Sequence, residues 1–174
     1  MRIEAEGCAL RPIRESDVDI IVAAMRDPEV VHWLPNIPQP YGPADARSFI
    51  AVASSWLRAG RDASFAIVDE RDTLLGVVGV RASEDPPTVG YWVAAEARGL
   101  GLATAATSAL CTWAFRTFAC PRLALHAEQG NIASRRVAEK CGFARVDGTV
   151  LGVADRELWV FELWREADAL RRAP

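Results

Sequence analysis

Two short stretches of this sequence carry residue types and spacings that could do chemistry. The first is Arg98-Gly99-Leu100-Gly101-Leu102-Ala103-Thr104, which lies between a strand-like run and a long helical run. Glycines at a strand-to-helix junction leave backbone N–H groups unpaired, and the start of the helix adds partial positive charge to the same place. This turn can therefore hold phosphate, although two glycines also fit a plain connecting loop.

The second stretch follows about thirty residues later and reads Asn131-Ile132-Ala133-Ser134, then Glu139-Lys140-Cys141-Gly142-Phe143. Asn is a favoured residue at a helix start and Gly a favoured residue just past a helix end, so Asn131 and Gly142 have a structural explanation. That explanation leaves Ser134 unaccounted for. The presence of both stretches, in this order along one chain, is more informative than either stretch alone.

The elements that must position these stretches follow from hydrophobic spacing and from Pro and Gly breaks. Expected strands cover residues 8–13, 64–69, 74–81, 89–93, 122–127, 143–147 and 157–164, the last two as a hairpin. Expected helices cover residues 15–25, 43–60, 102–118 and 131–141, and the proline-rich segment 27–41 is expected to be an ordered loop. Helices that alternate with strands around a meander indicate an α/β (α+β mixed) sheet.

The bulk properties limit the function classes. With 174 residues, we expect one domain over 1–174, with a core at about 8–164 and a charged tail at 165–174. The net charge of −3 and the lack of a basic run argue against nucleic-acid binding. No apolar run is long enough to span a membrane and residues 1–14 do not resemble a signal peptide, so cytoplasm is the expected compartment.

The cysteine and histidine residues are not spaced like metal ligands, and we expect no metal site. Cys8, Cys111, Cys120 and Cys141 show no C-x-x-C spacing and suit small buried side chains. His32 and His126 are far apart in the sequence. Arginine supplies nearly all of the positive charge, and Ala is abundant, which suggests a bacterial source with a GC-rich genome.

The chain resembles the GNAT superfamily of N-acetyltransferases, and within it the RimJ/RimL type. The residues that carry the resemblance are Arg98-x-x-Gly101-x-Ala103, Asn131-x-x-Ser134, Glu139-Lys140-x-Gly142-Phe143, Asp27-Pro28-Glu29 with Trp33-x-Pro35, and Gly90-Tyr91-Trp92-Val93. The resemblance runs in order from about residue 9 to 164. It implies a strongly twisted mixed sheet of about seven strands with about four helices, splayed between the fourth and fifth strands.

The resemblance also implies a co-substrate, acetyl-CoA. Its pyrophosphate would lie on the turn formed by Arg98, Gly99, Leu100, Gly101, Leu102, Ala103 and Thr104. Its pantetheine arm would run beside Trp92 and Val93, because an open strand edge can pair with a peptide-like chain. A bulge there would turn the Val93 N–H toward the thioester carbonyl, as an oxyanion donor. The alternatives are a solvated Arg98, a Thr104 hydroxyl bonded within its helix, and an ordinary core strand at 91–93.

In RimJ/RimL-like proteins the residue at Asn131 contacts the pantetheine arm and the serine at Ser134 lies near the sulfur. We therefore expect Asn131 and Ser134 in the cofactor site, with Ser134 as a thiolate-stabilising donor or general acid. Many GNAT enzymes have a tyrosine acid four residues beyond this serine, where this chain has Ala138. A thiol of pKa about 8.5 is a reasonable leaving group without a dedicated acid.

The general base is less clearly marked. Many relatives carry a glutamate on the fourth strand, and this chain has none there. Glu84 is the candidate we select, acting through a water, with Asp85, Glu128 and Glu157 as further acids; all of them could instead be solvated surface carboxylates. An acceptor of low basicity is then favoured, which points to a protein N-terminal α-amino group or a small-molecule amine over lysine.

The acceptor is expected to lie against the first two helices and the proline-rich segment. His32, Trp33, Tyr41 and Phe49 could line that region, or could pack the segment on the core. The function we predict is acetyl transfer by direct attack in a ternary complex, with a non-catalytic acyl-CoA-binding domain as the main alternative and a dinucleotide-binding module as a poor one. A homodimer is an assembly that the resemblance allows.

Overall fold

A computed structural model describes residues 1–166 of the chain. Most of the predicted charged tail, residues 167–174, lies outside the described residues.

The described residues form one eight-stranded sheet with the strand order β1-β2-β3-β4-β5-β6-β8-β7. The strands are β1 (Ile3–Ala5), β2 (Cys8–Pro12), β3 (Ala63–Val68), β4 (Leu74–Arg81), β5 (Thr88–Val93), β6 (Arg122–Glu128), β7 (Ala144–Leu151) and β8 (Glu157–Trp164). All neighbouring pairs are antiparallel except β5 and β6, which are parallel. The mixed sheet that the sequence predicts is confirmed.

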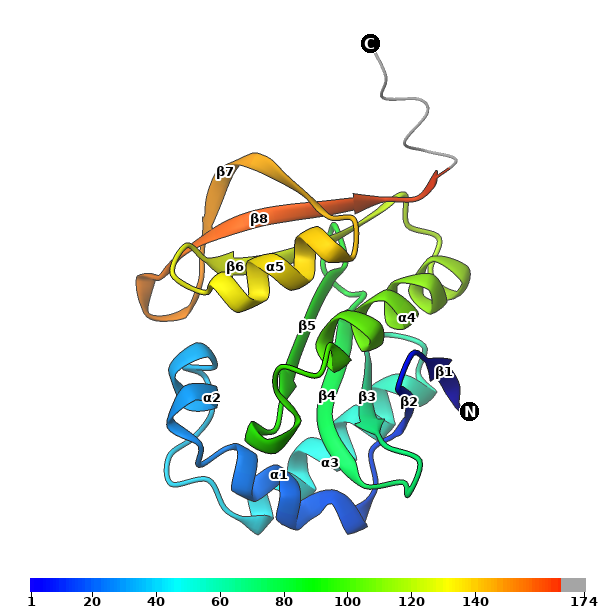
Figure 1. The fold of residues 1–174 in the computed structure, drawn as a ribbon, viewed down its shortest axis with the longest axis vertical. Helices are drawn as coiled ribbons and strands as arrows, with labels where there is room; N and C mark the ends of the chain where they lie inside the picture. Colours follow the sequence, from blue (N-terminus) through cyan, green and yellow to red (C-terminus); the bar gives the residue numbers. More distant parts are fainter. Residues whose placement is uncertain (167–174) are drawn as a thin grey trace.

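Helices cover both faces of this sheet (Figure 1). They are α1 (Val18–Ala24), α2 (Pro28–Trp33), α3 (Pro43–Arg58), α4 (Leu102–Thr117) and α5 (Ile132–Lys140), with short 3-10 turns at Glu15–Asp17, Ala95–Ala97 and Val153–Asp155. One hydrophobic core joins α4 and α5 to the odd-numbered residues of β5 and β6. A second core joins α1, α2 and α3 to the opposite face of β3, β4 and β5.

The sheet splits where its one parallel pair begins. Pairing between β5 and β6 is confined to Thr88–Ala124 and Val89–Leu125, although β5 continues to Val93 and β6 to Glu128. Beyond those two pairs the strands run in diverging directions (Figure 1). The splay between the fourth and fifth predicted strands is therefore confirmed, because the short β1 shifts the count by one.

Three elements differ from the sequence prediction. β1 has only three residues, too few for a periodic signal, and the residues of β7 are mostly exposed, so that its pattern does not mark where it ends. The prediction of a loop over 27–41 is wrong for the start of that segment, which forms α2. Pro28 stands in the first turn of α2 and the Asp27 carboxylate accepts a hydrogen bond from the Glu29 N–H at 2.9 Å, a helix start that the proline-rich context obscured.

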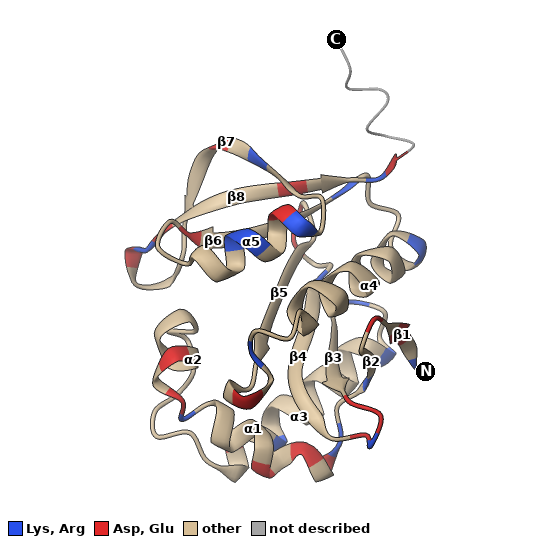
Figure 2. Cartoon of the chain, in the orientation of Figure 1, with Lys and Arg blue, Asp and Glu red and all other residues tan. Residues whose placement is uncertain are grey.

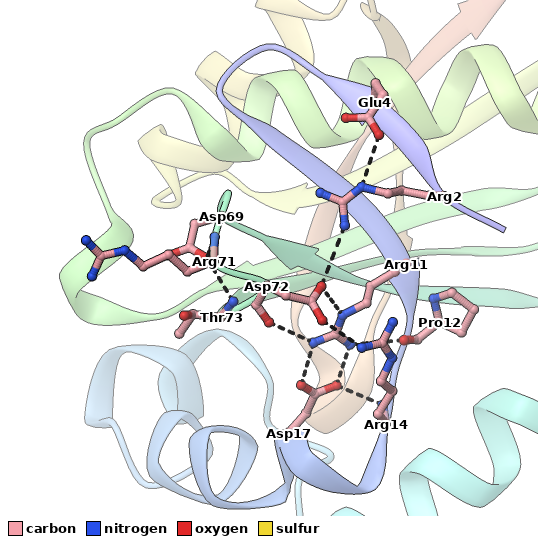
Figure 3. A network of polar contacts seen from close by, with 10 residues as sticks. All are labelled: Arg2, Glu4, Arg11, Pro12, Arg14, Asp17, Asp69, Arg71, Asp72 and Thr73. Carbon is pink, nitrogen blue, oxygen red and sulfur yellow. Dashed lines mark hydrogen bonds and ion pairs between the residues drawn. The ribbon is translucent and has the colours of Figure 1, made fainter.

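A buried ion pair ties β2 to the start of α1 (Figure 3). The Arg11 guanidinium donates two hydrogen bonds of 2.8 Å to the two carboxylate oxygens of Asp17, and both side chains are nearly fully buried. Its remaining N–H groups reach the Pro12 carbonyl and both the carboxylate and the carbonyl of Asp72. Because every N–H of the guanidinium has an acceptor, the buried charge is fully compensated.

We predict that Asp17→Ala lowers the free energy of unfolding by about 3–5 kcal/mol, because it leaves the Arg11 charge buried without its main partner. Urea denaturation at pH 7 measures this loss. Glu15→Ala is the matched control on the same 3-10 turn: Glu15 pairs with Arg47 on the surface, where both side chains are exposed, and should change stability by less than about 1 kcal/mol. Similar small losses in both variants would contradict the prediction.

Candidate active site

The splay opens into a cleft of about 970 Å³. Its walls come from β5, the turn before α4, the end of β6, α5, α2 and the tip of the β7–β8 hairpin. Of the residues that the sequence singles out, the cleft is lined by Trp33, Glu84, Trp92, Val93, Arg98, Gly99, Gly101, Leu102, Ala103, Thr104, Glu128, Asn131 and Ser134. One cavity thus brings together both stretches that carry the sequence argument.

The edge of β5 that faces the splay presents free backbone groups. The Ala94 N–H donates to Leu75 of β4, whereas the Pro87 carbonyl accepts from Ala124 of β6. Hydrogen-bonding direction alternates along a strand, so the N–H and C=O groups of Tyr91 and Val93 point away from β4 and toward the splay. Val93 was predicted for this position, and Tyr91 is an equivalent donor that the sequence analysis missed.

The implied bulge beside Val93 is not seen in the pairing of β5 with β4. The register runs without a shift from Gly76–Val93 to Arg81–Thr88. The two strands part because β6 turns away after Leu125, where its neighbour becomes β8 alone. The open edge therefore needs no irregularity in β5 itself.

The glycine turn places N–H groups at the mouth of the cleft. Gly99 and Gly101 have φ angles of 76° and 79°, a left-handed conformation that side chains with a Cβ rarely adopt. The first N–H groups that bond back into α4 are those of Thr104 and Ala105, both to the Gly101 carbonyl. The N–H groups of Leu102 and Ala103 precede that ladder and, with the positive end of the helix, form a site for an anion.

Two residues of the predicted turn contribute less than expected through their side chains. Leu102 is buried in the core, so its part in anion binding is limited to the backbone. Leu100 is 68% exposed and does not line the cleft.

The Arg98 side chain is partly exposed, and its guanidinium is held by two carboxylates. It donates to the Asp27 carboxylate at 2.5 Å and to the Glu29 carboxylate at 2.7 Å. The hydrogen bond from the Glu29 N–H and the Arg98 guanidinium hold the pKa of Asp27 below its usual value. Arg98 thus joins the glycine turn to the start of α2, and any electrostatic attraction to a phosphate would compete with this pair of acids.

Asn131 and Ser134 begin α5 on the other side of the splay. The Asn131 Oδ1 accepts a hydrogen bond of 3.0 Å from the Ser134 N–H, which makes Asn131 the helix N-cap. Both residues also line the cleft, so the cap role and a ligand role are compatible. Ala138 is fully buried in the core, consistent with the absence of a tyrosine acid there.

Tyr91 places a phenol beside Ser134 and was missed as a polar site residue. Its side chain points to the face of the sheet that α4 and α5 cover, and it lines the cleft. Burial raises the pKa of Tyr91 to about 12, while its hydrogen bond with Ser134 acts in the opposite direction. The Gly90-Tyr91-Trp92-Val93 run was the signal that could have identified it, since the tyrosine lies on the same face as Val89.

α5 carries several Lys and Arg residues (Figure 2), and some of them line the cleft. Arg136 and Lys140 are exposed, line the cleft and lie one helical turn apart on one face of α5. Neighbouring Arg135 is used differently, because its guanidinium stacks on Trp159 at 4.5 Å and donates to the Gln129 carbonyl. The sequence analysis missed Arg136 and Lys140, whose spacing of four was the available signal.

Three of the four predicted base candidates are held by another side chain, and the fourth, Asp85, does not line the cleft. Glu84 accepts from Arg81 at 2.9 Å and Glu128 accepts from Arg156 at 2.6 Å, and both glutamates line the cleft. Glu157 accepts from Thr149 outside the cleft lining. Each of these three carboxylates thus already accepts a hydrogen bond from a neighbouring side chain.

The residues predicted around the acceptor separate into two groups. Trp33 lines the cleft at the end of α2, where Arg156 also donates to the backbone carbonyl of His32 at 2.6 Å. The exposed His32 side chain and the half-buried Phe49 are not in the cleft lining. Tyr41 is 5% exposed and packs in the core with α1 and α3, so the prediction that it lines the acceptor site is corrected to a packing role.

The cysteines carry no sign of nucleophilic or metal chemistry. Cys141 donates to the Thr104 carbonyl at 3.4 Å, and burial raises its thiol pKa to about 11, which keeps it protonated near neutral pH. Among residues 1–166, no group of three or more His, Cys, Asp or Glu side chains is placed to hold a metal ion. No helix in that part of the chain has the length and apolar character needed to cross a membrane.

Comparison with known proteins gives this architecture a family. Residues 8–144 match a family model described as an acetyltransferase (GNAT) domain. A 55-residue stretch is 46% identical to YdaF of Bacillus subtilis (strain 168), a protein named for ribosomal N-acetyltransferase activity. That match covers 32% of this chain and 30% of the relative, so the chain is aligned to less than a third of the relative's length.

Solved structures share the fold over nearly the whole chain. RimL, described as a ribosomal L7/L12 α-N-protein acetyltransferase in complex with coenzyme A, is 19% identical with a TM-score of 0.80, covering 97% of this chain and 100% of that one. RimJ of Mycobacterium smegmatis in complex with CoA-disulfide is 20% identical with a TM-score of 0.79, covering 96% of this chain and 87% of that one. At these identities the likeness establishes the fold.

We predict that Gly101→Ala weakens coenzyme A binding by tenfold or more, about 1.4 kcal/mol, because its Cβ enters the anion cradle. Gly148→Ala is the matched control: Gly148 also has a positive φ, 103°, with nothing near a built Cβ, but lies on β7 outside the cleft lining. Both variants should lose about 1–2 kcal/mol of stability from left-handed strain. Calorimetric titration that finds equal affinities for both variants would contradict the assignment.

Proposed function

Because the chain belongs to the GNAT acetyltransferase family and carries that family's N-acetyltransferase domain, we propose that it transfers acetyl from acetyl-CoA to a protein N-terminal α-amino group. The observation that carries the proposal is the open edge of β5 beside the glycine turn. Three features support it: a cradle for a pyrophosphate, two inward N–H groups for a peptide-like arm, and a cleft that continues to the opposite face of the sheet.

The cofactor would be held largely by backbone. The N–H groups at Gly99, Gly101, Leu102 and Ala103 would bind the pyrophosphate, with Thr104 close by. The pantetheine arm would pair with the edge of β5 beside Trp92 and Val93. It would also accept a hydrogen bond from the side-chain NH₂ of Asn131, which the helix cap does not use. Arg136 and Lys140 are placed to attract the remaining phosphate of the nucleotide end.

The chemistry needs no enzyme-bound acyl group. The neutral amine attacks the thioester carbonyl, the carbonyl oxygen gains charge, and an N–H of Tyr91 or Val93 stabilises that oxygen. The C–S bond then breaks, and the departing sulfur is stabilised by the Ser134 hydroxyl, which also lies beside the Tyr91 phenol. The protonated, half-buried Cys141 thiol supports direct attack over a cysteine intermediate.

Two considerations favour an α-amino acceptor. The acids in the cleft are paired with arginines, and an amine of pKa about 7.7–8.0 loses its proton to a weak base or to water more readily than lysine at about 10.4. Apolar side chains that a peptide could contact, those of Trp33, Leu151 and Val153, line the cleft between α2 and the β7–β8 hairpin. The names of YdaF and RimL, which refer to ribosomal and α-N-protein acetylation, point the same way.

We propose that residues 1–174 form a single domain, that the protein works in a bacterial cytoplasm, that a homodimer is its assembly, and that it uses neither a metal nor nucleic acid. A small-molecule amine remains the second acceptor class, because the cleft would also admit one.

The test measures coenzyme A release with two peptides of the same sequence, which includes an internal lysine. One peptide has a free N-terminus and the other has a blocked N-terminus. At pH 7.4 roughly a quarter of an α-amino group is neutral and about 0.1% of lysine, so we expect a preference on the order of 10²-fold for the free N-terminus. Mass spectrometry locates the acetyl group.

Three outcomes would overturn parts of the proposal. Lysine acetylation at a similar rate would contradict the acceptor argument. Acetylation of small amines alone would replace the peptide with a metabolite. Tight acetyl-CoA binding with no turnover on any amine would favour the non-catalytic acyl-CoA-binding alternative.

A further inference from the structure

His126 lies at the point where the sheet divides. It follows Leu125, the last residue of β6 that pairs with β5, and it pairs across to Val160 of β8. Leu123, Leu125 and Ala127 face α4 and α5 in the core, so side-chain alternation directs His126 to the opposite face. Ser134 and Tyr91 are on the α4–α5 side, which means that His126 approaches the splay from the acceptor side.

His126 also lines two cavities. One is the cleft, and the other is a smaller cavity of about 390 Å³. The residues that line both are Glu84, Thr88, His126 and Val150. The smaller cavity carries three carboxylates, those of Glu84, Asp85 and Glu162, so a proton that leaves the cleft through His126 reaches an acidic, open pocket.

We propose that His126 is the general base that removes a proton from the acceptor ammonium and releases it through the smaller cavity. The inference rests on the acetyl transfer proposed above. It gives a catalytic role to His126, for which the sequence predicts none because His126 and His32 are too far apart to suggest a metal site.

The protons balance as follows. The ammonium N–H bond breaks, its proton goes to a neutral imidazole nitrogen of His126, and the free electron pair attacks the thioester carbon. When the C–S bond breaks, the second proton leaves the amide nitrogen and reaches the sulfur beside Ser134. His126 then loses its proton to solvent, so the reaction yields the amide, the coenzyme A thiol and one proton.

The surroundings of His126 suit this role. Burial lowers the pKa of His126, the negative charge of Glu84 raises it, and Arg81 lowers it again. Glu162 of β8 and Arg122 on the same face of β6 form an ion pair at 3.2 Å, Glu128 is paired with Arg156, and Asp85 lies in the smaller cavity. Because these effects together lower the pKa of His126 below its ordinary value, the imidazole is neutral at pH 7 and can accept a proton.

The experiment compares the pH dependence of kcat for the unaltered enzyme, His126→Gln and His32→Gln, with a peptide acceptor at saturation. The unaltered enzyme should show an acid limb below pH 6.5, where kcat falls tenfold per pH unit. His126→Gln should lose on the order of 10²-fold in kcat, and its acid limb should move up to the pKa of the α-amine, about 7.7–8.0. Its coenzyme A affinity should remain, and His32→Gln should keep the limb.

A second variant, His126→Ala, keeps the proposal testable if Gln supplies a partial substitute. Added imidazole should restore its kcat, because the smaller cavity has room for the ring. The proposal is overturned if His126→Gln retains kcat within twofold, if its acid limb stays below pH 6.5, or if the limb moves upward in His32→Gln instead. Failure of the proposed function itself would be distinct, since the unaltered enzyme would then show no turnover.

Discussion

The early end of pairing between β5 and β6 is the constraint on which the rest of the site depends. Hydrogen bonds join the two strands at Thr88 and Val89, and beyond that point β5 is bonded to β4 alone. Backbone N–H and C=O groups that face no partner strand are costly unless they are solvated or bound. The splay therefore offers Tyr91 and Val93 to a ligand of peptide-like character. The glycine turn follows a few residues after the end of β5, so one continuous segment of the chain can hold both ends of an extended molecule.

The sheet also divides the chemistry between its two faces. Side chains alternate along β5 and β6, so Tyr91 lies with Ser134 beneath α5 while His126 and Glu128 lie on the opposite face. A thiolate that leaves on one side and an ammonium that arrives on the other need different protein groups. The splay is where the two sides meet. Ion pairs hold the flanking elements around it: Arg98 joins the glycine turn to α2, and Arg156 joins the hairpin to β6 and α2.

Much of the fold and part of the site could be predicted from the sequence. Helix caps, glycine breaks and alternation are local signals, and they identified α1, α3, α4, α5 and the order of the longer strands. The hydrogen-bond and ion-pair partners of side chains are set by tertiary packing, so local sequence signals do not predict them. Arg98 was expected to serve an anion, yet Asp27 and Glu29, some seventy residues earlier, hold it. Tyr41 was expected in the acceptor site and is buried. Tyr91 and His126 could be placed in the cleft only from the pairing of β5 and β6 with their neighbours, because that pairing decides on which face each side chain lies.

The most direct measurement of the central claim is backbone amide exchange at β5 with and without saturating acetyl-CoA. The account predicts that the amides of Tyr91 and Val93 become protected on binding, because they face the splay and would pair with the pantetheine arm. Those of Gly90 and Trp92, which point to β4, should change little. Protection that is absent at Tyr91 and Val93 while the cofactor is bound would contradict the account. The open edge of β5 would then be a structural feature without a ligand.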